Sequence, residues 1–231
     1  MASRPSASLM KKRKTEIYET FDKRIYIFCE GTKTEPNYFR SMKEAIEGNP
    51  IYKNRVFIQI EGVGKDTIRV IQSAQEYIEG QAIRNADVWC VYDKDSFPSA
   101  SFNAVSEKAT MLSQNEKSVT YYAAWSNQCI EYWFILHFDF YIANNDRKQY
   151  MEYLNQQFAG LGLGRYQKNS ASMFHLLYEY GNPKQAIQFA KKQLDFFDTK
   201  TDADSAPATK VFLLVEELAR YLPEMMKSKF I

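Results

Sequence analysis

The chain has 231 residues, of which 45% are hydrophobic and 15% aromatic, enough apolar material for the core of one large globular domain or a domain with an appendage. Its 30 Lys and Arg residues nearly balance 28 Asp and Glu residues, so the net charge of +2 neither demands nor excludes a nucleic acid partner. No apolar run reaches the roughly 18 residues of a membrane span, and the start has no apolar stretch typical of a secretory signal. We therefore expect a cytoplasmic protein that does not enter the membrane.

The cysteines support the same expectation. Cys29, Cys90 and Cys129 are far apart, and each lies in an apolar context. A disulfide framework or a structural zinc site would normally show paired spacings such as CxxC. We expect three free, buried thiols in a reducing compartment.

The first 22 residues form a polar segment that contains little to bury. It turns basic at Lys11, Lys12, Arg13 and Lys14. We interpret residues 1–22 as a flexible arm that contributes salt-sensitive affinity for nucleic acid or a partner rather than stability to the fold.

Residues 23–142 alternate between strand-like and helix-like segments. Predicted strands cover 24–30, 56–62, 87–93 and 119–125, and predicted helices cover 35–47, 66–79, 100–114 and 128–140. Such alternation predicts βαβ units, that is, an α/β fold with a parallel sheet sandwiched by helices. Right-handed crossovers then place the carboxyl ends of all four strands at one edge.

The remaining residues, 143–231, lose the strand signal. Helical patterns cover 146–158, 171–179, 183–197 and 208–221. We interpret this part as a helical C-terminal appendage packed on the core. The loop DTKTDADSAP at 198–207 lacks the glycine and glutamate of an EF-hand, so we expect a solvated loop rather than a calcium site.

Acidic residues gather where the predicted strands end. Glu30 and Glu61 lie at the ends of the first two strands, and Asp93 and Asp95 follow the third. Ligands of parallel sheets bind at this edge, and crowded carboxylates suit a hard divalent cation such as Mg²⁺ or Mn²⁺. Glu30 must then approach Asp93 and Asp95, so the first and third strands should be neighbours.

Each of these acids also has a local explanation. Glu30, Asp93 and Asp95 are acceptable as helix-cap or turn residues. Glu131, in SNQCIEYWFILHF, lies one place beyond the capping-box position and serves either the metal site or the positive end of a helix dipole. The two histidines, His137 and His175, form no HExxH or triad pattern, so we expect them in the core or at its boundary.

Basic residues near these strand ends are candidates to hold phosphate oxygens. EGVGKDTIRV offers a glycine-rich turn with Lys65, although it is not a P-loop because GxxxxGK[ST] is absent. Lys33 and Lys94 flank the predicted acids, and Lys168 lies in the turn GRYQKN. A surface turn remains the alternative for the last.

Several motifs together resemble a known family. The segments CEGTKTEPNYF, VWCVYDKDSF, SNQCIEYWFILHF, the YQK turn and SAPATKVFLLVEEL occur in the order typical of RloB-like proteins, spread over residues 24–221. The third segment has Gln and Ile near Cys129 where other residues are expected, but it keeps Asn127, Glu131 and Trp133.

The resemblance implies a fold and a chemistry. RloB-like proteins resemble the Toprim group, which includes the catalytic domains of primases and topoisomerases and the OLD-type nucleases. A Toprim-like core would use Glu30, Asp93 and Asp95 as ligands of Mg²⁺ or Mn²⁺, with Glu30 alternatively a general acid or base. Lys94 joins these three as a catalytic candidate, and Glu131 is a fourth metal candidate. The substrate-binding candidates are Lys33, Lys65, Asn127 and Lys168.

The family resemblance also implies partners. It predicts a nuclease effector of DNA, RNA or tRNA in a restriction-linked or abortive-infection anti-phage system, working with a separate AAA or ABC-type ATPase encoded nearby. The chain has no Walker motif of its own, which fits a separate ATPase. A homo-oligomer is compatible with the sequence. The competing class is a Toprim-like binding module without turnover, which recognises nucleic acid or a phage protein and signals to the ATPase.

Overall fold

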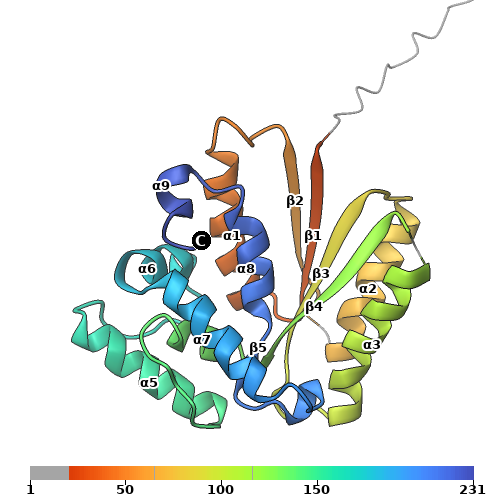
Figure 1. Ribbon diagram of the computed structural model, residues 1–231. Helices are drawn as coiled ribbons and strands as arrows, with labels where there is room; N and C mark the ends of the chain where they lie inside the picture. Colours follow the sequence, from red (N-terminus) through yellow and green to blue (C-terminus); the bar gives the residue numbers. More distant parts are fainter. Residues whose placement is uncertain (1–20, 65, 116) are drawn as a thin grey trace, which may run out of the picture.

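The computed structural model describes residues 21–64, 66–115 and 117–231, and its centre is a five-stranded sheet (Figure 1). The strands are β1 (Lys23–Cys29), β2 (Val56–Gly62), β3 (Ala86–Asp93), β4 (Val119–Asn127) and β5 (Ala208–Thr209). Their order is β2-β1-β3-β4-β5, with β1 to β4 parallel and β5 antiparallel to β4. The predicted α/β fold is confirmed, and so is the adjacency of the first and third strands. Lys65 and nearly all of the predicted arm lie outside the described residues.

The first strand shows why this sheet needs two covering layers. Ile25, Ile27 and Cys29 point to one buried cluster, whereas Tyr26 and Phe28 point to another. Alternate side chains of a strand face opposite sides of the sheet, so a strand apolar at every position is stable only where both faces are covered.

Helices provide these two layers (Figure 1). One face packs against α2 (Thr67–Gly80) and α3 (Ser99–Asn115). The other face packs against α1 (Thr34–Glu47) and helices from the second half of the chain. These are α4 (Glu131–Ile135), α5 (Arg147–Gly160), α6 (Met173–Tyr180), α7 (Pro183–Phe196), α8 (Val211–Ala219) and α9 (Glu224–Lys227).

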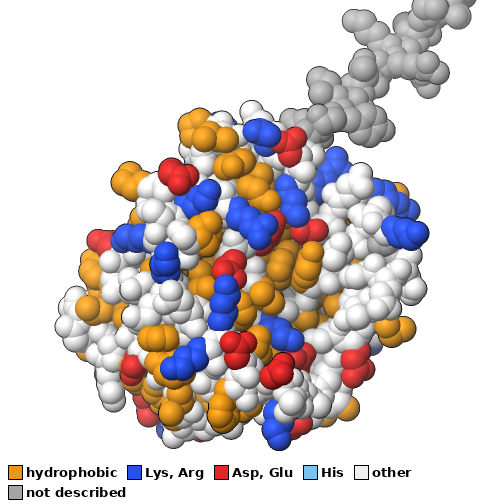
Figure 2. Space-filling model, viewed as in Figure 1, with side chains coloured by type: hydrophobic (Ala, Val, Ile, Leu, Met, Phe, Trp, Pro, Cys, Tyr) orange, Lys and Arg blue, Asp and Glu red, His pale blue; other side chains and the backbone are white. Residues whose placement is uncertain are grey.

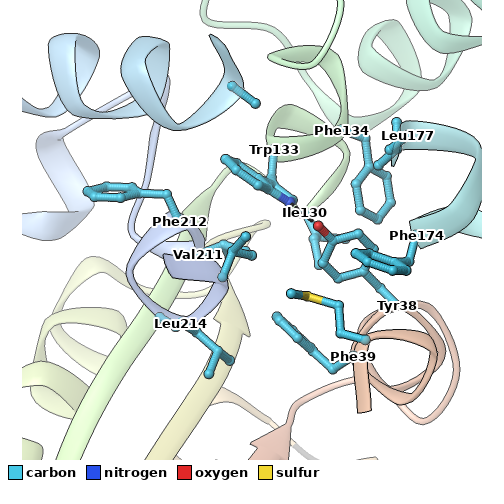
Figure 3. Packing of buried hydrophobic residues seen from close by; sticks show 14 of the residues in the cluster. Tyr38, Phe39, Ile130, Trp133, Phe134, Phe174, Leu177, Val211, Phe212 and Leu214 are labelled. Atoms are coloured by element: carbon cyan, nitrogen blue, oxygen red, sulfur yellow. Dashed lines mark hydrogen bonds between the residues drawn. The ribbon is translucent and has the colours of Figure 1, made fainter. Parts of the chain in front are cut away.

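Aromatic side chains fill the larger of the two clusters (Figure 3). Tyr38 of α1 packs against Phe134 of α4 and Phe174 of α6, with ring centroids 5.5 and 5.8 Å apart. The buried Trp133 indole donates a hydrogen bond of 3.1 Å to the Tyr38 hydroxyl, so neither polar group is left unpaired. This packing joins α1 to the helices that follow β4.

The segment 143–231 shares its core with the preceding residues. A single cluster contains Ile25 of β1 together with Tyr150 and Leu154 of α5 and Val215 of α8. The segment also adds β5 to the sheet, with Asn127 paired to Ala208. The boundary at residue 142 stays a prediction, since nothing in the fold separates the two parts there.

Two predicted helix boundaries and the predicted solvation of one loop were wrong. The helix predicted over 128–140 is only the five-residue α4, and the helix predicted from 208 begins at Val211 because β5 precedes it. The loop 198–207 is not wholly solvated, because Ser205 is buried and Asp202 pairs with Lys210 at 2.9 Å.

The cysteines and the surface charges are distributed as the sequence suggests. Cys29, Cys90 and Cys129 are free and buried, as predicted. Basic and acidic side chains are interspersed on the face shown in Figure 2, with apolar groups between them. Within the part of the chain that the structure describes, no helix has the length and apolar character to cross a membrane.

Candidate active site at the carboxyl ends of the strands

A cavity of about 550 Å³ opens where β1 and β3 end. Its walls come from the turn after β1, the start of α1, the segment between β2 and α2, the loop after β3, the first residue of α5 and the turn before α6. The charged side chains that line it are Glu30, Lys33, Glu35, Asp66, Asp93, Asp95, Arg147 and Lys168. The cavity therefore combines the predicted acids with basic groups suited to an anionic ligand.

Glu30 is held between two strand ends. Its backbone N–H donates to the Val91 carbonyl at 2.8 Å, and its carbonyl accepts from the Gly64 N–H at 2.9 Å. Its carboxylate accepts a hydrogen bond of 3.1 Å from the backbone N–H of Asp93. Burial, with Asp95 and other acids nearby, raises the pKa of Glu30 to about 7.

Asp93 is the last residue of β3, and Asp95 lies in the loop that follows, which is held by hydrogen bonds to the end of β4. The Lys94 N–H donates to the Ser126 carbonyl at 2.9 Å, and the Asp95 N–H donates to the Gln128 carbonyl at 3.0 Å. Asp95 has a φ of 39°, a left-handed conformation that Asp tolerates better than most residues. Burial raises the pKa of both carboxyl groups, that of Asp93 well above its usual range.

Arg147 joins the two aspartates and was not predicted from the sequence. Its Nη2 lies 2.8 Å from Asp93 Oδ2 and 2.9 Å from Asp95 Oδ2. Residue 147 is separated from both acids by more than 50 positions and belongs to no motif with them. Only the packing of α5 beside α4 brings this guanidinium to the strand ends.

Glu35, on the first turn of α1, is a second residue that the sequence argument did not assign to the site. Its side chain is 6% exposed, and burial together with Glu131 raises the pKa of its carboxyl group. A Cβ atom at position 31 would meet this carboxylate well inside contact distance, so a side chain there would require the buried carboxylate to move. The EGxxxE spacing from Glu30 to Glu35, with the glycine between, was the available signal.

Glu131 lies behind the cavity rather than in its wall. It is completely buried and accepts a hydrogen bond of 3.0 Å from the Tyr166 hydroxyl. The turn that contains Tyr166 and Lys168 is also tied to α1, where Ser41 donates to the Ala171 carbonyl at 2.7 Å. These contacts place Lys168 in the cavity wall.

Of the other predicted residues, some line the cavity and some lie outside its wall. Lys33 is exposed and lines the cavity. The Lys94 ammonium donates to the Phe97 carbonyl within its own loop, and the buried Asn127 amide donates to the Ala203 carbonyl at 2.9 Å. Neither side chain is in the cavity wall. Glu61 is also outside the wall and accepts a hydrogen bond from Gln59 at 2.8 Å.

The donor set suits a hard divalent cation, although its side chains have not converged around one point. In the described part of the chain, no three His, Cys, Asp or Glu side chains are arranged to hold a metal ion. Asp93 Oδ1 and Glu131 Oε2 are buried without a hydrogen-bond partner among these residues, and a guanidinium already bridges Asp93 and Asp95. Carboxylate oxygens left free beside a bridging cation fit Mg²⁺ or Mn²⁺ chemically, once the side chains turn toward a shared ion.

Fold and site define an α/β protein with a carboxylate-rich cavity at the carboxyl edge of a mostly parallel sheet. The family model of the RloB-like proteins matches residues 25–218, and the chain belongs to this family. Neither a curated protein nor a solved structure matches the chain. The family resemblance seen in the sequence is thus confirmed.

Proposed function

We propose that this protein is a divalent-metal-dependent nuclease with a Toprim-like core. The carrying observation is the meeting of Glu30 with Asp93 and Asp95 at the ends of adjacent parallel strands, where the two aspartates already share a cation. Lys33 and Lys168 line the same cavity and would neutralise phosphate oxygens. This pairing of acids for a metal with bases for a phosphate supports phosphodiester cleavage.

Glu30, Asp93 and Asp95 would hold Mg²⁺ or Mn²⁺. The bound ion would supply Lewis-acid activation of a water and of the scissile phosphate. Glu30, with its pKa raised to about 7 mainly by burial, is suited to hold or accept a proton near neutral pH if it is not a ligand. Lys33 and Lys168 would orient the phosphodiester.

A Mn²⁺-stimulated cleavage assay tests the proposal. Plasmid, single-stranded DNA, RNA and tRNA are each incubated with the full chain, Mn²⁺ or EDTA, and the products are resolved by size. Glu30→Gln and Asp93→Asn should abolish cleavage. Asp204→Asn is a matched control, because Asp202 and Asp204 form a second DxD pair that is outside the cavity wall. Equal cleavage by wild type and Asp93→Asn would refute the proposal.

The biological setting is part of the same proposal. From its membership of the RloB-like family we infer that the nuclease is the effector of an anti-phage system and is triggered by a separate ATPase; the chain itself has no Walker motif. Co-purification with the products of the neighbouring genes, followed by phage challenge of cells carrying both, tests this inference. An effector that protects cells without any ATPase would contradict it.

One observation favours a non-catalytic binding module instead. Arg147 pairs with both aspartates, so the site has a stable arrangement of charges without a metal. A binding module would retain its affinity for nucleic acid or a phage protein in EDTA and would show no cleavage with any metal. The same assay therefore separates the two functions.

A further inference from the structure

Arg147 pairs with the two aspartates through a single nitrogen. Nη2 contacts Asp93 Oδ2 at 2.8 Å and Asp95 Oδ2 at 2.9 Å. Arginine in a permanent structural ion pair commonly presents two parallel N–H groups to one carboxylate. Here a single nitrogen contacts one oxygen of each carboxylate, the same arrangement that a metal ion bound between two carboxylates would have.

This pairing leaves buried polar atoms unsatisfied on both sides. Arg147 Nε and Asp93 Oδ1 are buried and have no hydrogen-bond partner among the described residues. An unpaired buried polar atom is costly, and most native structures avoid it. The guanidinium would therefore form additional hydrogen bonds if it turned from the aspartates to another partner.

The position of Arg147 in its helix points the same way. It is the first residue of α5, where the helix dipole disfavours a positive charge. The backbone there is fixed by a capping box, in which Asp146 accepts from the Gln149 N–H at 2.9 Å and Gln149 accepts from the Asp146 N–H at 3.1 Å. Movement is thus confined to the side chain of Arg147, which is 33% exposed.

The surroundings of Arg147 offer a second partner. Its side chain lines both the main cavity and a second cavity of about 510 Å³ that shares Asp95 and Phe97 with the first. Lys33 and Lys168 are the other basic side chains in the wall of the main cavity, within the described residues. An anionic group held there would be within the reach of a guanidinium released from the aspartates.

We propose that Arg147 exchanges partners during the reaction. Without metal it neutralises Asp93 and Asp95; once a divalent cation is bound by these carboxylates, the guanidinium turns into the cavity and holds a phosphate of the nucleic acid. Arg147 is then both a competitor of the metal and a substrate-binding residue. This inference rests on the proposed metal-dependent nuclease function.

Mn²⁺ binding to the full chain without nucleic acid tests the competition, with isothermal titration calorimetry as the readout. Loss of a charged hydrogen-bonding competitor in Arg147→Met should tighten Mn²⁺ binding about tenfold. Arg147→Lys keeps the charge and should bind Mn²⁺ with an affinity between those of wild type and Arg147→Met, and it serves as the test variant if Arg147→Met does not fold. Arg165→Met, which removes an exposed arginine outside the cavity wall, should leave Mn²⁺ affinity unchanged.

Binding of a single-stranded oligonucleotide tests the phosphate role. In Ca²⁺, used in place of Mn²⁺ to suppress cleavage, Arg147→Met should bind about tenfold more weakly than wild type and Arg165→Met, because a charged hydrogen bond to phosphate is lost. In EDTA this difference should shrink, because Arg147 then remains on the aspartates. Tighter metal binding with weaker oligonucleotide binding is not expected from a merely structural arginine.

The outcomes separate this inference from the proposed function. If wild type binds Mn²⁺ and cleaves, but Arg147→Met has unchanged or weaker Mn²⁺ affinity, the exchange of partners is refuted and the nuclease stands. Unchanged oligonucleotide affinity in Ca²⁺ likewise refutes the phosphate role alone. If neither wild type nor Arg147→Met binds Mn²⁺ or cleaves, both proposals are overturned.

Discussion

The Tyr166 hydroxyl donates a hydrogen bond of 3.0 Å to Glu131 Oε1, joining the turn before α6 to the short helix α4. The other carboxylate oxygen, Oε2, is buried without a partner among the described residues. Loss of the Tyr166 hydroxyl would therefore leave this buried carboxylate short of a hydrogen-bond donor. The same contact anchors the turn that carries Lys168 to the cavity.

Tyr166→Phe removes the hydroxyl and keeps the ring. It should destabilise the protein by about 1–3 kcal/mol, the cost of leaving a buried acceptor unpaired. Urea unfolding of both proteins measures the difference. Glu131→Leu has no carboxylate that could be left unpaired, so in this background Tyr166→Phe should lower the free energy of unfolding much less. An equal loss of stability in both backgrounds would show that Glu131 is not the relevant partner.

The close approach of the Glu35 carboxylate to Gly31 gives a second prediction. Gly31→Ala should displace this buried carboxylate and destabilise the protein by about 1–3 kcal/mol, as overpacking does. Combining it with Glu35→Ala should remove most of the added cost. Gly160→Ala is the control, because nothing lies within 4 Å of a Cβ there, and it should stabilise the protein by about 0.4–1 kcal/mol. If the losses of unfolding free energy in Gly31→Ala and Glu35→Ala simply add in the double variant, the two side chains do not clash and the prediction is wrong.

The sequence predicted the parallel core because its signals are local. Each of β1 to β4 is a run of apolar or alternating residues followed by a helix-length segment, and strand ends of that kind collect at one edge. The adjacency of β1 and β3 followed from the chemistry of Glu30 and Asp93 rather than from any pattern. The approach of Glu30 to within 3.1 Å of the Asp93 N–H agrees with that reasoning.

The missed features depend on long-range packing. β5 has two residues, too few to show a period, and it forms only because β4 offers a free edge. The apolar run after Asn127 predicts one long helix where the structure has the five-residue α4, since a segment buried on all sides has no amphipathic pattern to mark its end. Arg147 reached the site through helix packing, which a reading of local motifs does not capture.

His137 gives a prediction on pH. It is buried, its Nδ1 donates to the Trp133 carbonyl at 3.0 Å, and burial lowers its pKa from 6.5 to about 4. Between pH 6.5 and about pH 4, His137 binds a proton in the unfolded chain but not in the folded chain. The stability that the neutral, buried imidazole contributes is therefore fully present above pH 6.5 and is lost as the pH falls toward 4. The full loss would be on the order of 3 kcal/mol.

Urea unfolding at pH 7 and pH 5 measures this linkage. His137→Gln should lose the part of the pH dependence that His137 contributes. His175→Gln changes the other of the two histidines, which is exposed, and should keep the pH dependence of the wild type. Identical slopes in wild type and His137→Gln would contradict the assignment to His137.

Asp93→Asn separates a metal ligand from a structural partner of Arg147. The asparagine keeps the shape of the side chain and an oxygen for Arg147, and it removes one negative charge from a site that also holds Glu35, Asp95 and Glu131. If Asp93 is there for a metal, the metal-free variant should unfold within about 1 kcal/mol of wild type, the size of an ordinary hydrogen bond. If Asp93 instead stabilises the fold through its ion pair with Arg147, the cost should be about 1.5–3 kcal/mol, below that of a fully buried pair because the Arg147 side chain is 33% exposed.

Asp93→Asn should also change how the protein responds to Mn²⁺. Mn²⁺ at 100 times its dissociation constant should stabilise the wild type by about 2.7 kcal/mol, because the ion binds the folded state alone. Asp93→Asn should lose that stabilisation together with nuclease activity and phage protection, whereas Asp204→Asn should keep all three. The measurement is urea unfolding with and without Mn²⁺, beside cleavage and phage challenge in cells that carry the ATPase. A well-folded Asp93→Asn protein that is still stabilised by Mn²⁺ and still protects cells would remove Asp93 from the mechanism.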